Sequence, residues 1–302
     1  MKAKSKAYIS LHIAILFFGA TAVLGDLIVL DAMILVWWRL ILSLVAFIPI
    51  FVIYNLFQFW KELLYVKKEL ILVGIFLALH WVTFFASVKL ANASVAVLCL
   101  SATSLMTSFM EPIIIGRRFR KMEFAFGALI IPGMILVVES LKTDMMQGVI
   151  WGLGSAFLAS LFTTYNKKIV DRGNTVLFTF AELLIALVVV TVLVPIYAIG
   201  NDQLTLVPVS GANWLYLLIL SIVCTTICYT VAFRALRYMS AFTANLSINL
   251  EPVYGIILAW IILGDNEEVT SQFYWGAAFI IGIVLGYPFI ARKFYPEMSE
   301  MH

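Results

Sequence analysis

Apolar stretches long enough to cross a lipid bilayer recur along the whole chain, and only short connections separate them. A helix needs about 20 predominantly apolar residues to span the hydrocarbon core of a membrane. With 63% hydrophobic and 12% charged residues, the composition also differs from that of a soluble domain. The sequence therefore predicts an all-α polytopic membrane protein. Its ten transmembrane helices are expected over 8–25, 33–53, 70–90, 93–113, 122–139, 147–166, 175–197, 213–233, 240–263 and 271–291.

The positive charges alternate from one connection to the next. With the N-terminus placed in the cytoplasm, all but three of the 20 Lys and Arg residues fall on the cytoplasmic side. The exceptions are Lys89 and Lys142 on the outer side and Arg39 within a span. Lys and Arg concentrate in the cytoplasmic loops of membrane proteins. We therefore expect a multi-pass protein of the inner (plasma) membrane with both termini in the cytoplasm.

Two segments half a chain apart share their spacing and hydropathy. A shift of 148 residues aligns 88–101 with 236–249 and pairs Lys89 with Arg237. Each half then holds five spans, and because five is odd, the second half enters the membrane from the opposite side. This pattern predicts two inverted five-helix repeats with a site between them at the membrane midplane, as in many transporters. The repeats are expected to cover 1–143 and 144–302.

The ninth predicted helix carries a Leu-Glu-Pro sequence at 250–252, in the middle of an apolar span. An acidic turn at 264–267 follows it, and Trp-Gly-Ala-Ala at 275–278 opens the tenth helix. Together with the five-plus-five layout, these sequences resemble the drug/metabolite transporter superfamily, EamA type, over nearly the whole chain. Two positions depart from the family pattern. Thr103-Ser104 replaces the usual proline in the first half, and Phe18-Gly19 stands where Trp-Gly is common.

The resemblance implies a secondary transporter that works by alternating access around a midplane cavity. Members similar to this chain export amino acids and related metabolites across the inner membrane. Other relatives carry choline and similar quaternary amines, sugar phosphates or nucleotide-type compounds, so these substrates stay open as alternatives.

Two candidate binding residues lie nearest the predicted midplane, His80 and Glu251. An ionisable group at this depth should face protein or a water-filled cavity. Glu251 is a candidate to hold a proton or to receive a substrate ammonium group, and its alternative role is that of a packing carboxyl. His80, with Trp81 beside it, is a candidate for the cavity wall, and its alternative role is packing between helices.

Polar residues on the fourth and ninth predicted helices add further candidates. Asn245 and Asn249 share one face of their helix, and Ser101 and Ser104 are three residues apart on theirs. Small polar residues also join packed membrane helices, which is the alternative for these positions. The candidate substrate-binding residues are therefore His80, Trp81, Ser101, Ser104, Asn245, Asn249, Glu251, Thr21, Ser160 and Tyr229.

For three other ionisable groups within the spans, a structural role is the leading interpretation, and a functional role in the cavity is the alternative. Arg39 lies near the outer end of its helix and is interpreted as extending toward the outer interface. Glu182 is interpreted as bonding to a neighbouring helix, and Glu111 as a salt bridge or cap near the cytoplasmic end.

Other functional classes lack their sequence signatures. There is no Walker-type loop, so ATP is not expected to be the direct energy source. An intramembrane enzyme needs a nucleophile with a base or metal ligands at helical spacing, and neither His-Glu-x-x-His nor Gly-x-Ser-x-Gly occurs. A channel should show rings of charges or carbonyls, whereas the polar residues here cluster asymmetrically.

We therefore expect a transporter rather than an enzyme, with no cofactor, no bound metal and no nucleic-acid partner. The expected partners are a small-molecule substrate and the lipid bilayer. Coupling to protons stays open, as does the choice between a monomer and a homodimer.

Overall fold

The computed structural model describes residues 2–139, 145–199, 204–263 and 271–294, and within them the chain forms helices and no strand. The predicted all-α fold is confirmed. Seven helical stretches are long and apolar enough by themselves to cross a membrane, and 121–139, 241–263 and 271–294 complete the ten predicted spans. Six spans are single helices: α1 (Lys2–Leu27), α2 (Ala32–Ile53), α4 (Lys67–Leu90), α9 (Met146–Ile169), α10 (Thr175–Ala198) and α15 (Ser271–Phe294).

The other four spans are divided into shorter helices. The fifth consists of α7 (Lys121–Ala128) and α8 (Ile130–Glu139). The eighth consists of α11 (Gly211–Ser221), the π-helical turn η4 (Ile222–Ile227), α12 (Cys228–Ala235) and η5 (Leu236–Tyr238). The connection between the second and third spans also holds two short helices, η1 (Leu56–Phe59) and α3 (Glu62–Tyr65).

The fourth and ninth spans break at equivalent places. The fourth is formed by α5 (Ala93–Cys99), η2 (Leu100–Ala102) and α6 (Thr103–Ile115), and the ninth by α13 (Ala241–Ile248) and α14 (Glu251–Leu263). The same shift of 148 residues that aligns the sequences carries α6 onto α14. Ser104 stands at the position that matches Pro252, so the first half breaks here without a proline.

The two broken spans also begin in the same way. Asn92 caps α5 by accepting a hydrogen bond from Val95 N at 2.8 Å, and Ser240 caps α13 by accepting one from Thr243 N at 3.0 Å. The sequence shift pairs Asn92 with Ser240. A side-chain oxygen at this position bonds one of the free N–H groups at a helix start. Equivalent caps, breaks and ends therefore mark the fourth and ninth spans as one repeated unit.

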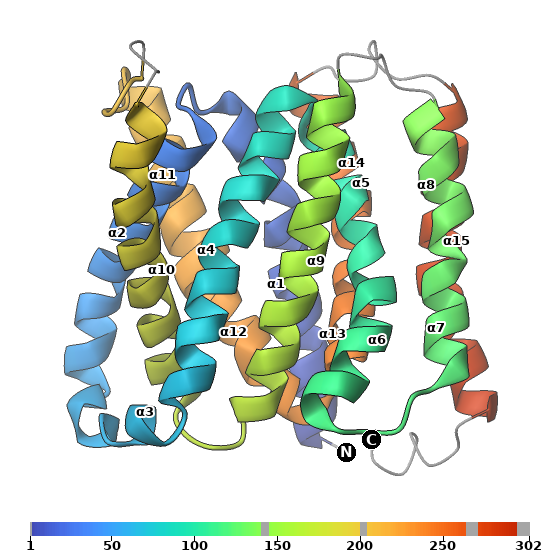
Figure 1. Ribbon diagram of the computed structural model, residues 1–302, viewed down its shortest axis with the longest axis horizontal. Coiled ribbons are helices and arrows are strands. Elements are labelled where there is room, and N and C mark those ends of the chain that lie inside the picture. Colours follow the sequence, from blue (N-terminus) through green and yellow to red (C-terminus); the bar gives the residue numbers. More distant parts are fainter. Residues whose placement is uncertain (1, 140–144, 200–203, 264–270, 295–302) are drawn as a thin grey trace.

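The packing of the helices repeats as well. Helix α1 of the first half packs on α14 of the second half. Its counterpart in the second half, α9, packs on α6 of the first half. Likewise α4 packs on α9, and its counterpart α12 packs on α1. In Figure 1, α1 begins at the lower edge and α9 at the upper edge, with α8 and α15 paired at one side. Equivalent helices therefore pack on equivalent partners from the other half, and they run in opposite directions. This is the arrangement of inverted repeats.

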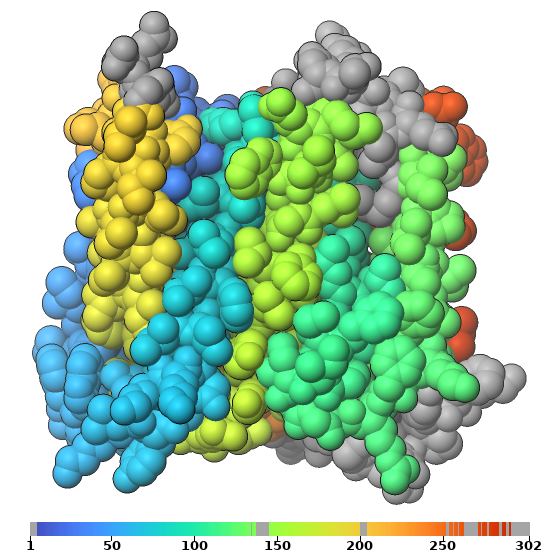
Figure 2. Space-filling view, in the orientation of Figure 1, coloured from blue at the N-terminus to red at the C-terminus, as the bar shows by residue number. Residues whose placement is uncertain are grey.

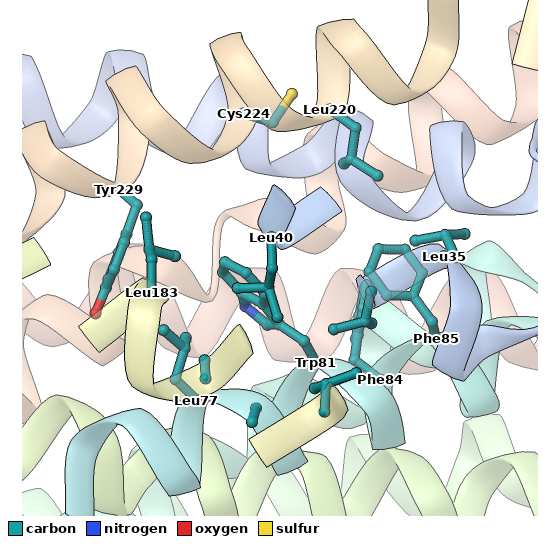
Figure 3. Close-up of a cluster of buried hydrophobic side chains, with 14 of the residues drawn as sticks. Leu35, Leu40, Leu77, Trp81, Phe84, Phe85, Leu183, Leu220, Cys224 and Tyr229 are labelled. Carbon is teal, nitrogen blue, oxygen red and sulfur yellow. The ribbon is translucent and has the colours of Figure 1, made fainter. Parts of the chain in front are cut away.

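The surface of the helix bundle is apolar at the level of the spans. Large side chains such as Ile150, Val188 and Val192 are more than half exposed on α9 and α10. These two helices and α4 form much of the face seen in Figure 2. Inside, buried residues of α2, α4, α10 and the eighth span form the largest apolar cluster, part of which is drawn in Figure 3. Apolar exposure of this extent suits lipid as the surrounding solvent.

One glycine permits a close approach between the repeats. A Cβ atom on Gly19 of α1 would lie 2.7 Å from Tyr254 Cβ and 2.9 Å from the backbone N of Gly255, both on α14. Backbone atoms cannot move aside as the end of a flexible side chain can. Small residues at such contacts are typical of membrane helices, because association there depends on close packing.

We predict that Gly19→Ala destabilises the protein, by about 1–3 kcal/mol, because it overpacks the contact between α1 and α14. The midpoint of thermal unfolding in detergent measures the effect. Gly154→Ala is the matched control, since no atom lies within 4 Å of the added Cβ. Equal unfolding midpoints for the two variants would contradict the close contact.

Candidate functional site

A cavity of about 120 Å³ lies between the two repeats. Its walls come from α1, α2, α4 and η2–α6 of the first half and from α9, the eighth span, α13 and α14 of the second. One water molecule needs roughly 10–15 Å³ measured in this way, so the cavity has room for a small organic molecule. Most of the wall is apolar or aromatic, and a few polar groups project into it. Concave sites of this composition are typical of small-molecule binding.

Arg39 points into this cavity and not toward the outer interface. Its Nε donates a hydrogen bond of 2.7 Å to Thr225 Oγ1, and its guanidinium carbon lies 3.8 Å from the centre of the Trp81 ring. The interpretation that Arg39 extends outward is therefore wrong. The ring face and the hydroxyl supply interactions that replace water around the guanidinium group.

The π-helical turn η4 places the partner of Arg39. Within it, the hydroxyl of Thr225 donates to the carbonyl of Leu220, five residues earlier, at 2.8 Å. Thr226 makes the equivalent bond to Ser221 at 3.0 Å. An inserted π turn rotates the residues that follow it relative to an ordinary helix, and such turns often occur at functional sites.

Glu251 begins α14 and lies in the wall of the same cavity. It is 6% exposed, and among the described residues it has no hydrogen-bond or ion-pair partner. Arg39 is 3% exposed, and no carboxylate of the described residues lies within ion-pair distance of its guanidinium group. The cavity wall therefore holds an acidic and a basic side chain that form no ion pair with each other.

His80 joins α4 to α9 at the edge of the cavity. Its Nδ1 lies 2.7 Å from Ser155 Oγ and 3.0 Å from the Ser155 carbonyl, while Ser155 Oγ donates to the His80 carbonyl at 3.0 Å. Because the hydroxyl proton is used in that bond, we assign the imidazole hydrogen to Nδ1. In the neutral ring, Nε2 is then an acceptor. His80 both packs the two helices together and borders the cavity.

Tyr229 and Asn166 connect the cavity with a carboxyl group behind its wall. The Tyr229 hydroxyl donates to Glu182 Oε2, and Asn166 Nδ2 donates to the same oxygen at 3.3 Å and to the Tyr229 hydroxyl at 3.0 Å. Glu182 is 0% exposed on α10. The interpretation that Glu182 bonds to neighbouring helices is confirmed, since its partners lie on α9 and α12.

The polar residues of the fourth and ninth spans bond mainly to each other. Asn249 Nδ2 donates to Ser104 Oγ at 3.0 Å and to the Ser101 carbonyl at 3.3 Å, which joins the two breaks. Asn245 Nδ2 donates to Thr107 Oγ1 at 2.7 Å, but Asn245 also lies in the cavity wall. Ser160, another predicted site residue, lies on α9, where its hydroxyl donates to the Phe157 carbonyl of the same helix at 2.8 Å.

The structure thus divides the predicted site residues into two groups. Those in the cavity wall are Thr21, His80, Trp81, Tyr229, Asn245 and Glu251. Those outside the wall are Ser101, Ser104, Ser160 and Asn249. Polar wall residues outside the predicted set of substrate-binding residues are Arg39, Thr103, Thr163 and Asn166. A signal for Arg39 was present, because it is the single basic residue deep within a predicted span.

A charged cluster outside the cavity connects the fourth, fifth and ninth spans at one end of the helix bundle. The carboxylate of Glu111 accepts hydrogen bonds from Ala241 N at 3.1 Å and Phe242 N at 2.8 Å, at the start of α13. Arg117 bonds to Glu111 at 2.9 Å and to Glu123 of α7. Burial lowers the pKa of Arg117, but the two carboxylates raise it by a larger amount, so the net shift of this pKa is upward. The interpretation of Glu111 as a cap and salt bridge is confirmed.

Comparisons with known proteins agree with this architecture. The model of a family described as "EamA-like transporter family" matches residues 5–139 and again 146–287. A solved structure titled "Crystal structure of protein" is similar in fold, with a TM-score of 0.68 and 17% sequence identity over 96% of this chain and 99% of the other. No match to a curated protein is found. The predicted repeat boundary at 143/144 lies outside the described residues and stays a prediction.

We predict that Asn249→Ala lowers the stability of the protein by about 1–3 kcal/mol, because it removes the two buried hydrogen bonds that Asn249 donates to Ser104 Oγ and to the Ser101 carbonyl. The shift of the thermal unfolding midpoint in detergent checks this expectation. Ser247→Ala is a suitable control, since the Ser247 hydroxyl only donates to Thr243 O of its own helix. An Asn249 variant as stable as the control would show that the bond between the two breaks contributes nothing.

Proposed function

The chain belongs to the EamA-like transporter family, and on that basis we propose that it is a secondary transporter exporting a small zwitterionic metabolite, such as an amino acid. Family and helical membrane fold together point to a transporter with a small-molecule substrate. The substrate, the direction and the binding residues belong to the proposal. In it, the two repeats rock around the cavity between them and expose it to each side of the membrane in turn.

The observation that carries the proposal is the pair of opposite charges in the cavity wall. Arg39 and Glu251 face one space without an ion pair between them. An uncompensated charge at membrane depth is expensive. A zwitterion lowers both penalties at once, with its carboxylate at Arg39 and its ammonium group at Glu251. The planar guanidinium group is well suited to a carboxylate, because its N–H donors match the two oxygens.

Aromatic side chains favour a substrate with an apolar part. Phe18, Phe84 and Phe162 lie in the cavity wall around the charged pair. Burial against such rings stabilises an aliphatic or aromatic group. We therefore place apolar amino acids first among the substrates.

The alternative substrates of the family suit this wall less well. Choline and other quaternary amines could use Glu251 and the aromatic rings, but they would leave Arg39 without an anion. Sugar phosphates and nucleotides carry more negative charge than one guanidinium group neutralises. Among the described wall residues, Arg39 is the one permanent cation. A zwitterion therefore matches the charges of the cavity wall better than a quaternary amine or a phosphate does.

We predict that Glu251→Gln folds normally but reduces amino-acid transport at least about tenfold, equivalent to about 1.4 kcal/mol. Glutamine keeps the shape of the side chain but cannot pair with an ammonium group. Counterflow of radiolabelled leucine in proteoliposomes measures the effect, with choline and glucose 6-phosphate as competing probes.

The matched control is Glu69→Gln, which removes a carboxylate that pairs with Lys168 at 3.7 Å near the cytoplasmic end, away from the cavity. It should transport at the wild-type rate. Near-wild-type counterflow by the Glu251 variant would show that Glu251 does not bind the substrate. Competition by choline but not by amino acids would show that the substrate is a quaternary amine and not a zwitterion.

The proposed orientation, with both termini in the cytoplasm, gives a further prediction. In a variant without the three native cysteines, Val209→Cys should react with an impermeant thiol reagent added to intact cells. Val209 is 65% exposed in the connection assigned to the outside. Arg118→Cys, also at an exposed position, should react only after the cells are opened. The reverse labelling pattern would show that the protein has the opposite orientation in the membrane.

A further inference from the structure

Glu182 is a buried carboxyl group that the proposed substrate does not use. Its Oε2 atom accepts both of the hydrogen bonds that the group receives, from Tyr229 and Asn166. Its Oε1 atom is buried and has no hydrogen-bond partner among the residues that the structure describes, and the same holds for Asn166 Oδ1. The amide that donates to Glu182 thus carries an unused acceptor, and Glu182 carries an unused oxygen.

The charged groups on the surrounding helices are engaged elsewhere. Arg39 of α2 contacts Trp81 and Thr225, and His80 of α4 is bonded to Ser155. Near the cytoplasmic ends, Glu69 pairs with Lys168, and Lys167 donates to a carbonyl of the eighth span. Arg234 of α12 is exposed. Among the described residues, none of these groups forms an ion pair with Glu182.

An unpaired carboxylate in such a place is unfavourable. Removal of a charge from water is costly unless an opposite charge and further hydrogen bonds replace the lost hydration. Two neutral donors on one oxygen are an incomplete replacement. A proton on Oε1 removes the charge and turns the unused oxygen into a donor. The surroundings of Glu182 therefore favour the neutral acid when the group is buried as it is here.

The same group is connected to the cavity through its two partners. Tyr229 and Asn166 both lie in the cavity wall, and both bond to Glu182 Oε2. Figure 3 shows Tyr229 beside Leu183, the residue that follows Glu182 on α10. A molecule in the cavity therefore contacts the side chains that hold the carboxyl group. Changes in how these two side chains are placed would alter how well the neutral acid is favoured.

We propose that Glu182, Asn166 and Tyr229 form a proton-binding site at the cavity wall, and that a proton carried by Glu182 drives export. The proposal rests on the transport function proposed above. In the outward-facing state, the carboxylate takes one proton from external water and becomes the acid. In the inward-facing state, the acid releases that proton to cytoplasmic water. One zwitterion leaves for each proton that enters, so each cycle moves one positive charge inward.

The first test needs no substrate. Infrared difference spectra of purified protein in lipid vesicles are recorded between acidic and alkaline buffer. The wild type and Glu69→Gln should show the carbonyl band of a protonated carboxylic acid, and Glu182→Gln should lose a component of it. A band that is unchanged in the Glu182 variant would overturn the proton site. Glutamine keeps the size of the side chain and an oxygen to accept from Tyr229, so the variant should fold.

The second test separates coupling from substrate binding, with radiolabelled leucine as the probe. Counterflow at equal pH needs only substrate exchange, whereas accumulation against a gradient needs the proton. Glu182→Gln should reduce pH-gradient-driven accumulation at least about tenfold while counterflow changes by less than about twofold. Accumulation that persists, or a parallel loss of both activities, would overturn the proposal. If the wild type carries no leucine, the amino-acid proposal fails, and the infrared band still decides the proton site.

Discussion

The lack of water in the bilayer core governs this structure, because every polar group at that depth must find its partner within the protein. The polar residues of the spans obey this constraint in different ways. Asn249 bonds across two helix breaks, His80 joins two helices through Ser155, and Arg39 rests on the face of Trp81. The first two contacts, and the hydrogen bond from Arg39 to Thr225, connect segments from opposite halves of the chain. The polar residues therefore assemble the cavity as well as line it.

The repeat explains where the cavity lies. The fourth and ninth spans begin with equivalent caps and break at equivalent positions, although only the ninth has a proline directly after the break. Broken helices at the interface of inverted repeats free backbone and side-chain groups near the midplane. At one end of the helix bundle, Glu111 and Arg117 connect the start of α13 with α6 and α7. A rocking motion of the repeats would have to rearrange this charged cluster.

Charge within the cavity gives the proposed mechanism its logic. Arg39 and Glu251 face the space without pairing, whereas Glu182 lies behind the wall with an oxygen unused. In our proposal the first two residues bind the ends of a zwitterion, and the third carries a proton. The substrate then passes as a neutral species, and the driving charge travels separately. Tyr229 touches both regions, since its ring lines the cavity and its hydroxyl bonds to Glu182.

The sequence by itself determined the architecture, because hydropathy, charge alternation and the internal repeat are properties of segments along the chain. It also singled out Glu251 and His80, since an ionisable group in an apolar span is visible without coordinates. It could not sort the remaining polar residues. The direction of Arg39 depended on a π turn and a tryptophan from two other helices, and Asn249 was drawn into a contact between spans rather than into the cavity. Such choices depend on which faces of distant helices meet, and only the tertiary structure decides that.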